Sequence, residues 1–539
     1  MAMMTGGEAI VRTLLANGAE TVFGIPGLHT LAIYDALFDH PNLRHILVRN
    51  EQAASIMANA VGRITGHPGI CLVTTGPAAC NALIGVADAT RESTPMLVVA
   101  SQIDSGLVGQ GKGAFHEMSD QKGMFQAAGA WTVHVNRVEQ IPAAINAAWV
   151  AMTHARPRPA YVEIPEDILG AKAEVQAATA PDAPQIGVSR QKATALIEAV
   201  RRARRPLVYV GGGAARSGAA NELRAFVERL DLPVVATING KGVLAEDHRL
   251  SAGVAPVKDP RFKALLPTVD LLVSLGAGFG QVSTYSWSVA WPAQVIQVDV
   301  DGSQIGKNIP ATTGVVGDVK TVLAQLNSVE VDTHPAANTK WVAEVKSLSD
   351  QVRRSEEDYP GCDFARIMRD VLPRNTVVVG DAQSWGTWLI HHYPVYAPGQ
   401  LIWPINFGTL GYSIPGALGV KAACPDCPVV AACGDGGFTF YANEFATAAQ
   451  HGLNIIVLVV NNSSLSVIRA LQTRIYGPQR VFAADLQNPD FEAYARAFGW
   501  FAVKINTLSD LAESLREALQ VGRPALIEIP FDIKTPESG

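Results

Sequence analysis

Long hydrophobic runs and concentrated positive charge are both absent from this sequence. No apolar stretch reaches the roughly 18 residues of a membrane-spanning helix. The first eight residues contain no basic segment followed by an apolar core, so we do not expect a signal peptide. The net charge is −6, and the densest basic cluster is residues 201–205. We therefore expect neither a membrane nor a nucleic acid as a partner.

Cysteine is scarce, with six residues scattered through a chain of 539. Cys424 and Cys427 have the spacing of a metal-binding pair, but no second pair completes a zinc site. We interpret this pair as part of a surface turn between a helix and a strand. Free thiols are expected, which is typical of a reducing compartment and predicts a cytoplasmic protein.

Charged residues are also sparse, at 17%, whereas hydrophobic residues make up 48%. This composition predicts large buried cores, and the length suffices for about three domains. Short apolar runs, such as residues 96–100 and 455–460, alternate with segments of helical apolar spacing. Such alternation is typical of parallel sheets covered on both faces. The sequence therefore predicts an α/β fold with three doubly wound parallel-sheet domains.

A Pro/Ala-rich segment at residues 175–184 predicts a linker, and a charged, helix-prone connector is expected at about 331–359. The expected domains are residues 1–172, 186–330 and 360–539. Residues 158–165 (RPAYVEIP) are nearly repeated at residues 523–530 (RPALIEIP). This echo predicts two copies of one domain that flank a different middle domain, with chance similarity of strand ends as the alternative.

A glycine-rich turn at residues 434–437 (Gly-Asp-Gly-Gly) follows an apolar run, and the pair Asn461-Asn462 begins 24 positions beyond its end. A carboxylate at the carboxyl end of a parallel strand points into the crevice where α/β sheets bind ligands. Glycines there let phosphate approach the backbone N–H groups. Asp435, the Asn462 amide and the Ser464 carbonyl would supply oxygen ligands suited to Mg²⁺. Taken alone, Gly-Asp-Gly is also a common turn sequence.

Glu51 follows the apolar run at residues 45–48 and opens a helical segment. Combined with the Gly-Asp-Gly-Gly and Asn-Asn pattern, this carboxylate makes the chain resemble the thiamine-diphosphate-dependent enzymes. That family includes acetolactate synthases, 2-oxo acid decarboxylases and benzaldehyde lyases. The resemblance implies that Glu51 activates the pyrimidine of the cofactor, which requires a fairly dry pocket. It also implies that the diphosphate is held through Mg²⁺.

Further cofactor contacts follow from the resemblance. The Gly-rich stretch at residues 406–415 resembles the loop beside the thiazole ring, where Leu410 would wedge between the two rings. Residues 75–81 resemble the turn beside the catalytic glutamate, although Ala78 replaces the usual glycine. The implied cofactor-binding residues are Pro26, Glu51, Thr75, Asn81, Gln383, Ser384, Asn406, Gly408, Leu410, Gly434, Gly436, Gly437 and Leu465.

We predict that the substrate is met by two catalytic histidines and by a pocket of apolar side chains. The histidines are His29 and His116, and the pocket residues are Phe115, Val467 and Leu471. Similar enzymes, including benzaldehyde lyase, carry a histidine at the offset of His29, whereas acetolactate synthases usually have glutamine at the position of His116. Neutral histidines there would relay protons as catalytic residues, and a backbone-bonded loop histidine is the alternative. Leu471 stands where acetolactate synthases usually have tryptophan, which argues against a role in branched-chain amino acid synthesis.

In the middle domain, residues 276–279 (Gly-Ala-Gly-Phe) replace the Gly-Ala-Arg-Phe of flavin-carrying relatives, which makes bound FAD doubtful. Residues 211–218 are glycine-rich and would suit either a nucleotide or a simple strand-to-helix turn. The resemblance also implies that two chains share each cofactor, in a homodimer or homotetramer.

The function implied is non-oxidative decarboxylation of a 2-oxo acid with thiamine diphosphate and Mg²⁺. It would end in release of an aldehyde or in carboligation to a second carbonyl. The alternative within the family is cleavage or formation of 2-hydroxy ketones, as in benzaldehyde lyase. A non-catalytic regulatory protein that binds thiamine diphosphate or a nucleotide is the alternative from another class. The presence of Glu51, Asp435 and Asn462 speaks against it.

Overall fold

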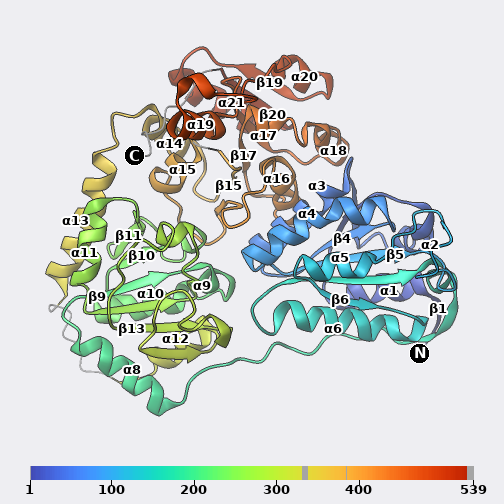
Figure 1. Ribbon diagram of the computed structural model, residues 1–539, viewed down its shortest axis with the longest axis horizontal. Coiled ribbons are helices and arrows are strands. Elements are labelled where there is room, and N and C mark those ends of the chain that lie inside the picture. Colours follow the sequence, from blue (N-terminus) through green and yellow to red (C-terminus); the bar gives the residue numbers. More distant parts are fainter. Residues whose placement is uncertain (1, 331–337, 384, 531–539) are drawn as a thin grey trace.

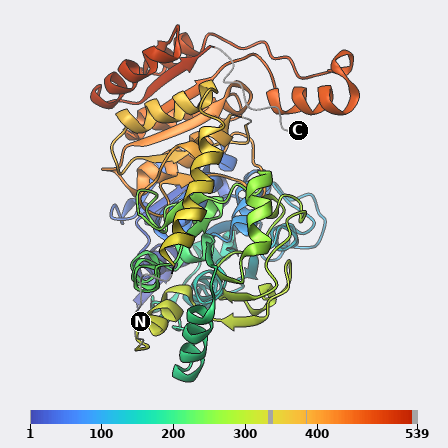
Figure 2. The ribbon, with the colours of Figure 1, turned by 90° about the vertical axis from the view of Figure 1, so that its left-hand side faces the viewer.

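The computed structural model describes residues 2–330, 338–383 and 385–530. Figure 1 shows three α/β bodies that follow one another along the chain, and Figure 2 shows the third body above the other two. Each body contains one six-stranded sheet, and all strand pairs within these sheets are parallel. The predicted α/β fold with three parallel-sheet domains is thereby confirmed.

The first sheet has the strand order β3-β2-β4-β5-β7-β6. Its strands are β2 (Thr21–Gly24), β3 (Arg44–Leu47), β4 (Gly69–Val73), β5 (Met96–Gln102), β6 (Trp131–His134) and β7 (Pro159–Pro165). The helices of this body are α1 (Gly6–Ala16), α2 (Leu31–Phe38), α3 (Glu51–Thr65), α4 (Pro77–Glu92), α5 (Gln121–Ala127), α6 (Ile141–Thr153) and α7 (Glu166–Gly170). A small antiparallel pair, β1 (Ala2–Thr5) and β8 (Lys172–Val175), joins its two ends.

The third sheet repeats this topology in the order β16-β15-β17-β18-β20-β19. Its strands are β15 (Val377–Val379), β16 (Leu401–Ile402), β17 (Val429–Gly434), β18 (Ile456–Val460), β19 (Phe501–Lys504) and β20 (Ala525–Ile529). The helices are α14 (Pro360–Val371), α15 (Gly386–His392), α16 (Ser413–Ala423), α17 (Asp435–Phe438), α18 (Phe445–His451), α19 (Ser466–Tyr476), α20 (Phe491–Ala497) and α21 (Leu511–Gln520). The two echoed sequence segments form β7 and β20, which occupy the same place in their sheets, as expected for copies of one domain.

The middle sheet differs, with the order β11-β10-β9-β12-β13-β14. Its strands are β9 (Pro206–Val210), β10 (Val234–Ala236), β11 (Ser251–Val254), β12 (Leu271–Leu275), β13 (Val295–Asp299) and β14 (Thr313–Val316). The helices are α8 (Arg190–Arg202), α9 (Gly212–Arg216), α10 (Ala220–Leu230), α11 (Pro260–Leu265), α12 (Val319–Asn327) and α13 (Thr339–Arg354). Helix α13 fills most of the predicted connector, whose residues 331–337 lie outside the described part. The exact domain boundaries stay predictions.

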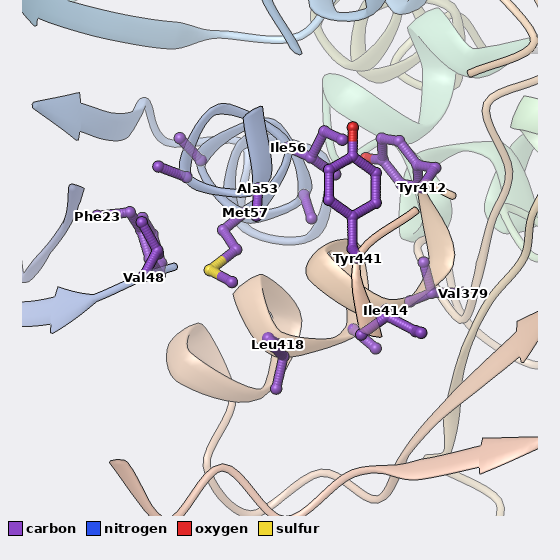
Figure 3. Packing of buried hydrophobic residues seen from close by; sticks show 14 of the residues in the cluster. Phe23, Val48, Ala53, Ile56, Met57, Val379, Tyr412, Ile414, Leu418 and Tyr441 are labelled. Carbon is purple, nitrogen blue, oxygen red and sulfur yellow. The ribbon is translucent and has the colours of Figure 1, made fainter. Parts of the chain in front are cut away.

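Helices α3 and α16 pack directly on each other and join the first and third domains. Met57 and Leu418 belong to one buried hydrophobic cluster that spans both domains (Figure 3). The approach is so close that a Cβ atom on Gly419 would lie 2.3 Å from the carbonyl oxygen of Met57. Glycine is therefore required at this crossing because a side chain would push the helices apart.

The prediction of free thiols is wrong for Cys424 and Cys427, which form a disulfide in the turn between α16 and β17. The turn was predicted, and it brings the two Cα atoms to 5.5 Å, within the range that a disulfide bridges. The other four cysteines carry free thiols. Among the described helices, none is long and apolar enough to cross a membrane.

Candidate functional site

Glu51 is the first residue of α3, as the sequence predicts. The helix starts there because Asn50 caps it, with its side chain accepting a hydrogen bond of 2.8 Å from the Gln52 N–H. The half-buried Glu51 carboxylate accepts a 2.9 Å hydrogen bond from the Asn81 amide on α4. Two residues predicted to act at the same end of the site are thus in direct contact.

The turn before α4 is held by a residue that the sequence did not reveal, Gln121. Its amide oxygen accepts hydrogen bonds from the buried Thr75 hydroxyl (2.8 Å) and from the Gly76 N–H (2.7 Å). Gly76 has φ +71, and a Cβ atom there would lie 2.7 Å from the His116 carbonyl oxygen. The turn therefore brings His116 close to the start of α4. Pro26, in the turn after β2, is exposed.

The structure brings His29, His116 and Phe115 together. The ring centroids of the two histidines lie 5.3 Å apart, and Phe115 stacks on His116 at 3.9 Å. Both Nδ1 atoms are buried and have no hydrogen-bond partner among the described residues. Burial lowers the pKa of His29, against the opposing charge of Glu166, whose carboxylate is 3.8 Å from Nε2. His29 is consequently neutral near pH 7, with polar atoms available to a ligand.

At the other end of the candidate site, β17 and β18 end side by side, with Gly434 paired to Val460. Asp435 therefore leaves the same sheet edge as Asn461, and it is only 2% exposed. Its carboxylate accepts hydrogen bonds from the Ser464 N–H (3.1 Å) and from the Asn488 amide (2.8 Å). Burial raises the pKa of Asp435, and the Asn488 hydrogen bond opposes this shift.

The predicted metal ligands Asp435, Asn462 and Ser464 gather around this edge. Asn462 donates from its amide to the Ser466 hydroxyl (2.6 Å), and the Ser464 carbonyl accepts from the Ser466 N–H (2.9 Å). Among the described residues, no three His, Cys, Asp or Glu side chains are grouped for a metal. One carboxylate with amide and carbonyl oxygens is a donor set that suits Mg²⁺ when diphosphate oxygens complete it.

The glycines of this turn leave room for a ligand beside the backbone. A Cβ atom on Gly434 would meet nothing closer than 3.9 Å, whereas one on Gly436 would lie 2.7 Å from the Leu465 side chain. Gly437 is tighter still, with the Asp381 carboxylate 2.5 Å from such an atom. The Gly434 side of the turn is therefore the open side, which fits a phosphate approaching the N–H groups at the start of α17.

Gln383 lies near the same edge and donates a 2.9 Å hydrogen bond to the Ala432 carbonyl. Its Oε1 atom is buried without a partner in the described part of the chain. Ser384 lies outside the described residues. Asn406 and Gly408 are exposed on the loop before α16, and Leu410 is half-buried there.

Val467 and Leu471 lie one turn apart on α19 and are 40% and 37% exposed. No residue of α19 is buried, so the helix offers an uncovered apolar face. The Glu51 carboxylate is hydrogen-bonded to Asn81 of the first domain, whereas the Asp435 carboxylate is hydrogen-bonded to Ser464 and Asn488 of the third. The two groups of predicted residues thus form separate clusters in this chain.

A large cleft of about 1470 Å³ lies where the three domains meet. The glycine-rich segments after β9 and β12 line it, at the carboxyl ends of neighbouring strands of the middle sheet. Asp299 at the end of β13 and Arg216 of α9 add charged groups to its wall. This is the crevice in which such sheets bind ligands, and the glycine-rich segment at residues 211–218 forms both part of its wall and the turn from β9 into α9.

Comparison with family models assigns all three bodies. Residues 4–124 match the thiamine pyrophosphate enzyme N-terminal TPP binding domain, residues 193–326 match the central domain of these enzymes, and residues 379–529 match their C-terminal TPP binding domain. The two TPP-binding domains are those with the repeated strand order, and they support thiamine diphosphate as the cofactor.

Similar proteins align along almost the whole chain. A probable acetolactate synthase large subunit of Methanocaldococcus jannaschii is 30% identical, over 98% of this chain and 92% of the relative. A probable 2-ketoarginine decarboxylase of Pseudomonas aeruginosa is 32% identical, over 98% and 94%. The acetolactate synthase large subunit of Corynebacterium glutamicum is 33% identical, over 97% and 86%. With the matching domain order, these similarities show that the chain belongs to the thiamine-diphosphate-dependent enzyme family.

Proposed function

We propose that this protein decarboxylates a 2-oxo acid with thiamine diphosphate and Mg²⁺, without oxidation. The reaction ends in release of an aldehyde or in carboligation to a second carbonyl. The observation that carries the proposal is the pair of clusters: Glu51 bonded to Asn81 in one TPP-binding domain, and Asp435 at the carboxyl end of β17 in the other. When bound, the cofactor supplies the electron sink for loss of CO₂.

Glu51 would hold a proton at a ring nitrogen of the pyrimidine, and Asn81 keeps its carboxylate in place. Such a contact needs a fixed carboxylate, and the Asn50 cap fixes the start of α3. Thr75 and Pro26 lie in the two turns that would border the pyrimidine. At the far end, Asp435, Asn462 and Ser464 would hold Mg²⁺. Gly434, Gly436, Gly437, Gln383 and Leu465 would then surround the diphosphate.

His29 and His116 are proposed to move protons on the substrate side. Their buried, unpartnered Nδ1 atoms are suited to a substrate oxygen, and burial keeps His29 neutral and able to accept a proton. Phe115 would cover the same side. These histidines also favour a second candidate function, the cleavage of 2-hydroxy ketones, because that reaction needs a base for the substrate hydroxyl.

We infer that the complete site forms between two copies of the chain, in a homodimer or homotetramer. The apolar residues of α19 support this, because Val467, Leu471 and Ile475 are exposed on a helix that buries none of its residues. A soluble helix with such a face is normally covered by another surface. Val467 and Leu471 would then line the substrate pocket opposite the histidines of the partner.

The proposal is tested by supplying the enzyme with thiamine diphosphate, Mg²⁺ and a panel of 2-oxo acids while CO₂ is measured. Glu51→Gln should bind the cofactor but lose CO₂ release, because a neutral amide holds no proton in this way. The control is Glu139→Gln, a change in a different turn of the first domain. Unchanged turnover in Glu51→Gln would overturn the mechanism. Cleavage of benzoin or acetoin, with no CO₂ from any acid, would favour the second candidate.

A further inference from the structure

Two buried carboxylates of the first domain bind the loop that precedes α16 in the third domain. Glu92 accepts hydrogen bonds from the backbone N–H of Asn406 (2.8 Å) and from its side-chain amide (3.0 Å). Asp88 accepts a 2.6 Å hydrogen bond from the Thr409 hydroxyl. Glu92 and Asp88 lie one turn apart on α4 and so face the same side of the helix.

A third buried carboxylate holds the far end of the same loop. Asp381 lies just after β15. Both of its carboxylate oxygens accept a hydrogen bond from the Gly411 N–H, at 2.8 Å for Oδ1 and 3.0 Å for Oδ2. The segment at residues 406–411, here called the clamped loop, is therefore fixed at its start, near its middle and at its end. Leu410 lies between two of these fixed points.

We propose that Glu92 and Asp88 are positioning residues that hold the clamped loop, and with it Leu410, in the shape that receives thiamine diphosphate. This inference rests on the proposed function. Neither carboxylate touches the cofactor in this scheme; each acts through the loop. Hydrogen bonds from outside the loop also hold the two carboxylates, from the Asn59 amide to Asp88 (2.9 Å) and from the Asn239 amide to Glu92 (2.8 Å).

Burial makes these contacts strong. Glu92 is 1% exposed and Asp88 is 0% exposed, so both are removed from water. A buried carboxylate is tolerated only when donors surround it, and hydrogen bonds to an ionised acceptor are about twice as strong as neutral ones. The loop supplies a large part of those donors. Moving the loop would remove two hydrogen bonds from Glu92 and one from Asp88, leaving those from Asn239 and Asn59, and this loss opposes any other loop conformation.

The clamp acts where the loop is exposed and where one backbone hydrogen bond, from the Gly408 N–H to the Pro404 carbonyl (2.8 Å), closes the turn. Gly408 has φ +74, is exposed, and has nothing within 4 Å of the position of a Cβ atom. Asn406 is also exposed. Without the carboxylates, the loop would therefore be free to adopt several shapes, and cofactor binding would have to select one of them.

Glu92 links this loop to the middle domain as well. Its Oε2 accepts a 2.8 Å hydrogen bond from the Asn239 amide, and the Arg63 guanidinium lies 3.8 Å away. Glu92, Asn239 and Asn406 all line the large cleft between the domains. One carboxylate thus holds segments from three domains in register.

The test compares Glu92→Gln with the wild-type chain. The variant keeps the shape of the side chain but removes the charge, so two charge-assisted hydrogen bonds to Asn406 weaken. We expect the dissociation constant for thiamine diphosphate, measured by calorimetry with Mg²⁺, to rise about tenfold or more. We also expect faster amide hydrogen exchange confined to the peptide that contains residues 405–411.

The matched control is Glu246→Gln, because Glu246 also joins two domains. Its carboxylate accepts the Val395 N–H (2.8 Å) and pairs with Lys241 (2.8 Å), but it does not contact the clamped loop. Its cofactor affinity should equal that of the wild type. If Glu92→Gln does not fold, Thr409→Val replaces it as the test. This variant removes the hydroxyl that donates a hydrogen bond to Asp88, and it should also weaken cofactor binding and speed up exchange in the clamped loop.

Equal affinity and equal loop exchange in Glu92→Gln and Glu246→Gln would overturn the positioning role while leaving the proposed function intact. Absence of thiamine diphosphate binding by the wild-type chain would overturn the proposed function, and this inference with it. Weaker binding in Glu92→Gln without faster exchange in the clamped loop would also overturn the inference, because the effect would then not pass through the loop.

Discussion

Replacing Gly419 with alanine should weaken both the fold and cofactor binding, because this residue sets the distance between α3 and α16. The added Cβ atom would lie 2.3 Å from the Met57 carbonyl oxygen, whereas ordinary contact begins near 3.4 Å. The helices must therefore separate by about 1 Å. Overpacking of this kind costs about 1–3 kcal/mol, which lowers the melting temperature by several degrees in a domain of this size.

The displacement should also reach the candidate site. Helix α3 begins at Glu51, and α16 begins two residues after the clamped loop ends at Gly411. Separating the helices moves these two parts relative to each other, so we expect the dissociation constant for thiamine diphosphate to rise several-fold. Such sites are sensitive because positioning errors of about 1 Å already impair function.

Thermal unfolding and calorimetric titration with thiamine diphosphate would measure the two effects. Gly170→Ala is the matched control, since a Cβ atom there would meet nothing within 4 Å. Both changes add one methyl group to a helical glycine, Gly419 inside α16 and Gly170 at the end of α7, and only the first meets a close contact. The reasoning is refuted if Gly419→Ala matches Gly170→Ala in melting temperature and in cofactor affinity.

Three further outcomes are expected. Asp435→Asn should abolish Mg²⁺-dependent binding of thiamine diphosphate in calorimetry, whereas Asn488→Ala should only weaken it, because Asn488 supports the carboxylate without replacing it; equal losses would contradict this. Burial raises the pKa of Glu444 to about 7 from an ordinary value of 4.5, so the folded state holds this proton more firmly than the unfolded state. The free energy of unfolding should therefore fall as pH rises from about 4.5 to 7 and level off above, and Glu444→Gln should remove up to about 3 kcal/mol of that fall in denaturant titrations at several pH values; parallel pH profiles would refute it. Ile475→Lys, at a position 60% exposed on α19, should shift the chain toward monomer in light scattering, whereas Val316→Lys, at 49% exposed in β14, should not; an unchanged mass would argue against α19 as the contact surface.

The sequence was sufficient to predict elements whose signals are local. Glu51 was placed at a helix start because an apolar run precedes it, and the structure adds that Asn50 caps this helix. Asp435 was placed at a strand end for a similar reason, and β17 does end at Gly434. The repeated domain was readable because the echoed residues form β7 and β20, strands buried along their whole length, where few side chains fit.

Contacts between distant segments were not predictable in the same way. Gln121 supports the Thr75 turn from 46 positions away, and Asn488 reaches Asp435 from 53 positions away. No local pattern marks either residue, because a single amide in a loop has many uses. Asp381 did carry a signal, since it follows an apolar strand just as Asp435 does. The spacing of Cys424 and Cys427 was also a local signal, but we interpreted it as a turn and did not predict the disulfide.

The duplicated domains explain why the candidate site has two dissimilar ends. Helix α3 follows the second strand of the first sheet, and α16 follows the second strand of the third sheet, so they are equivalent elements. These equivalent helices pack on each other in one shared core. The segments that precede them have diverged: a capped carboxylate, Glu51, on one side and the clamped loop with Leu410 on the other. Because one helix pair carries both segments, a shift of either helix moves Glu51 and the clamped loop relative to each other. A single methyl group added at Gly419 should therefore disturb both ends of the candidate site.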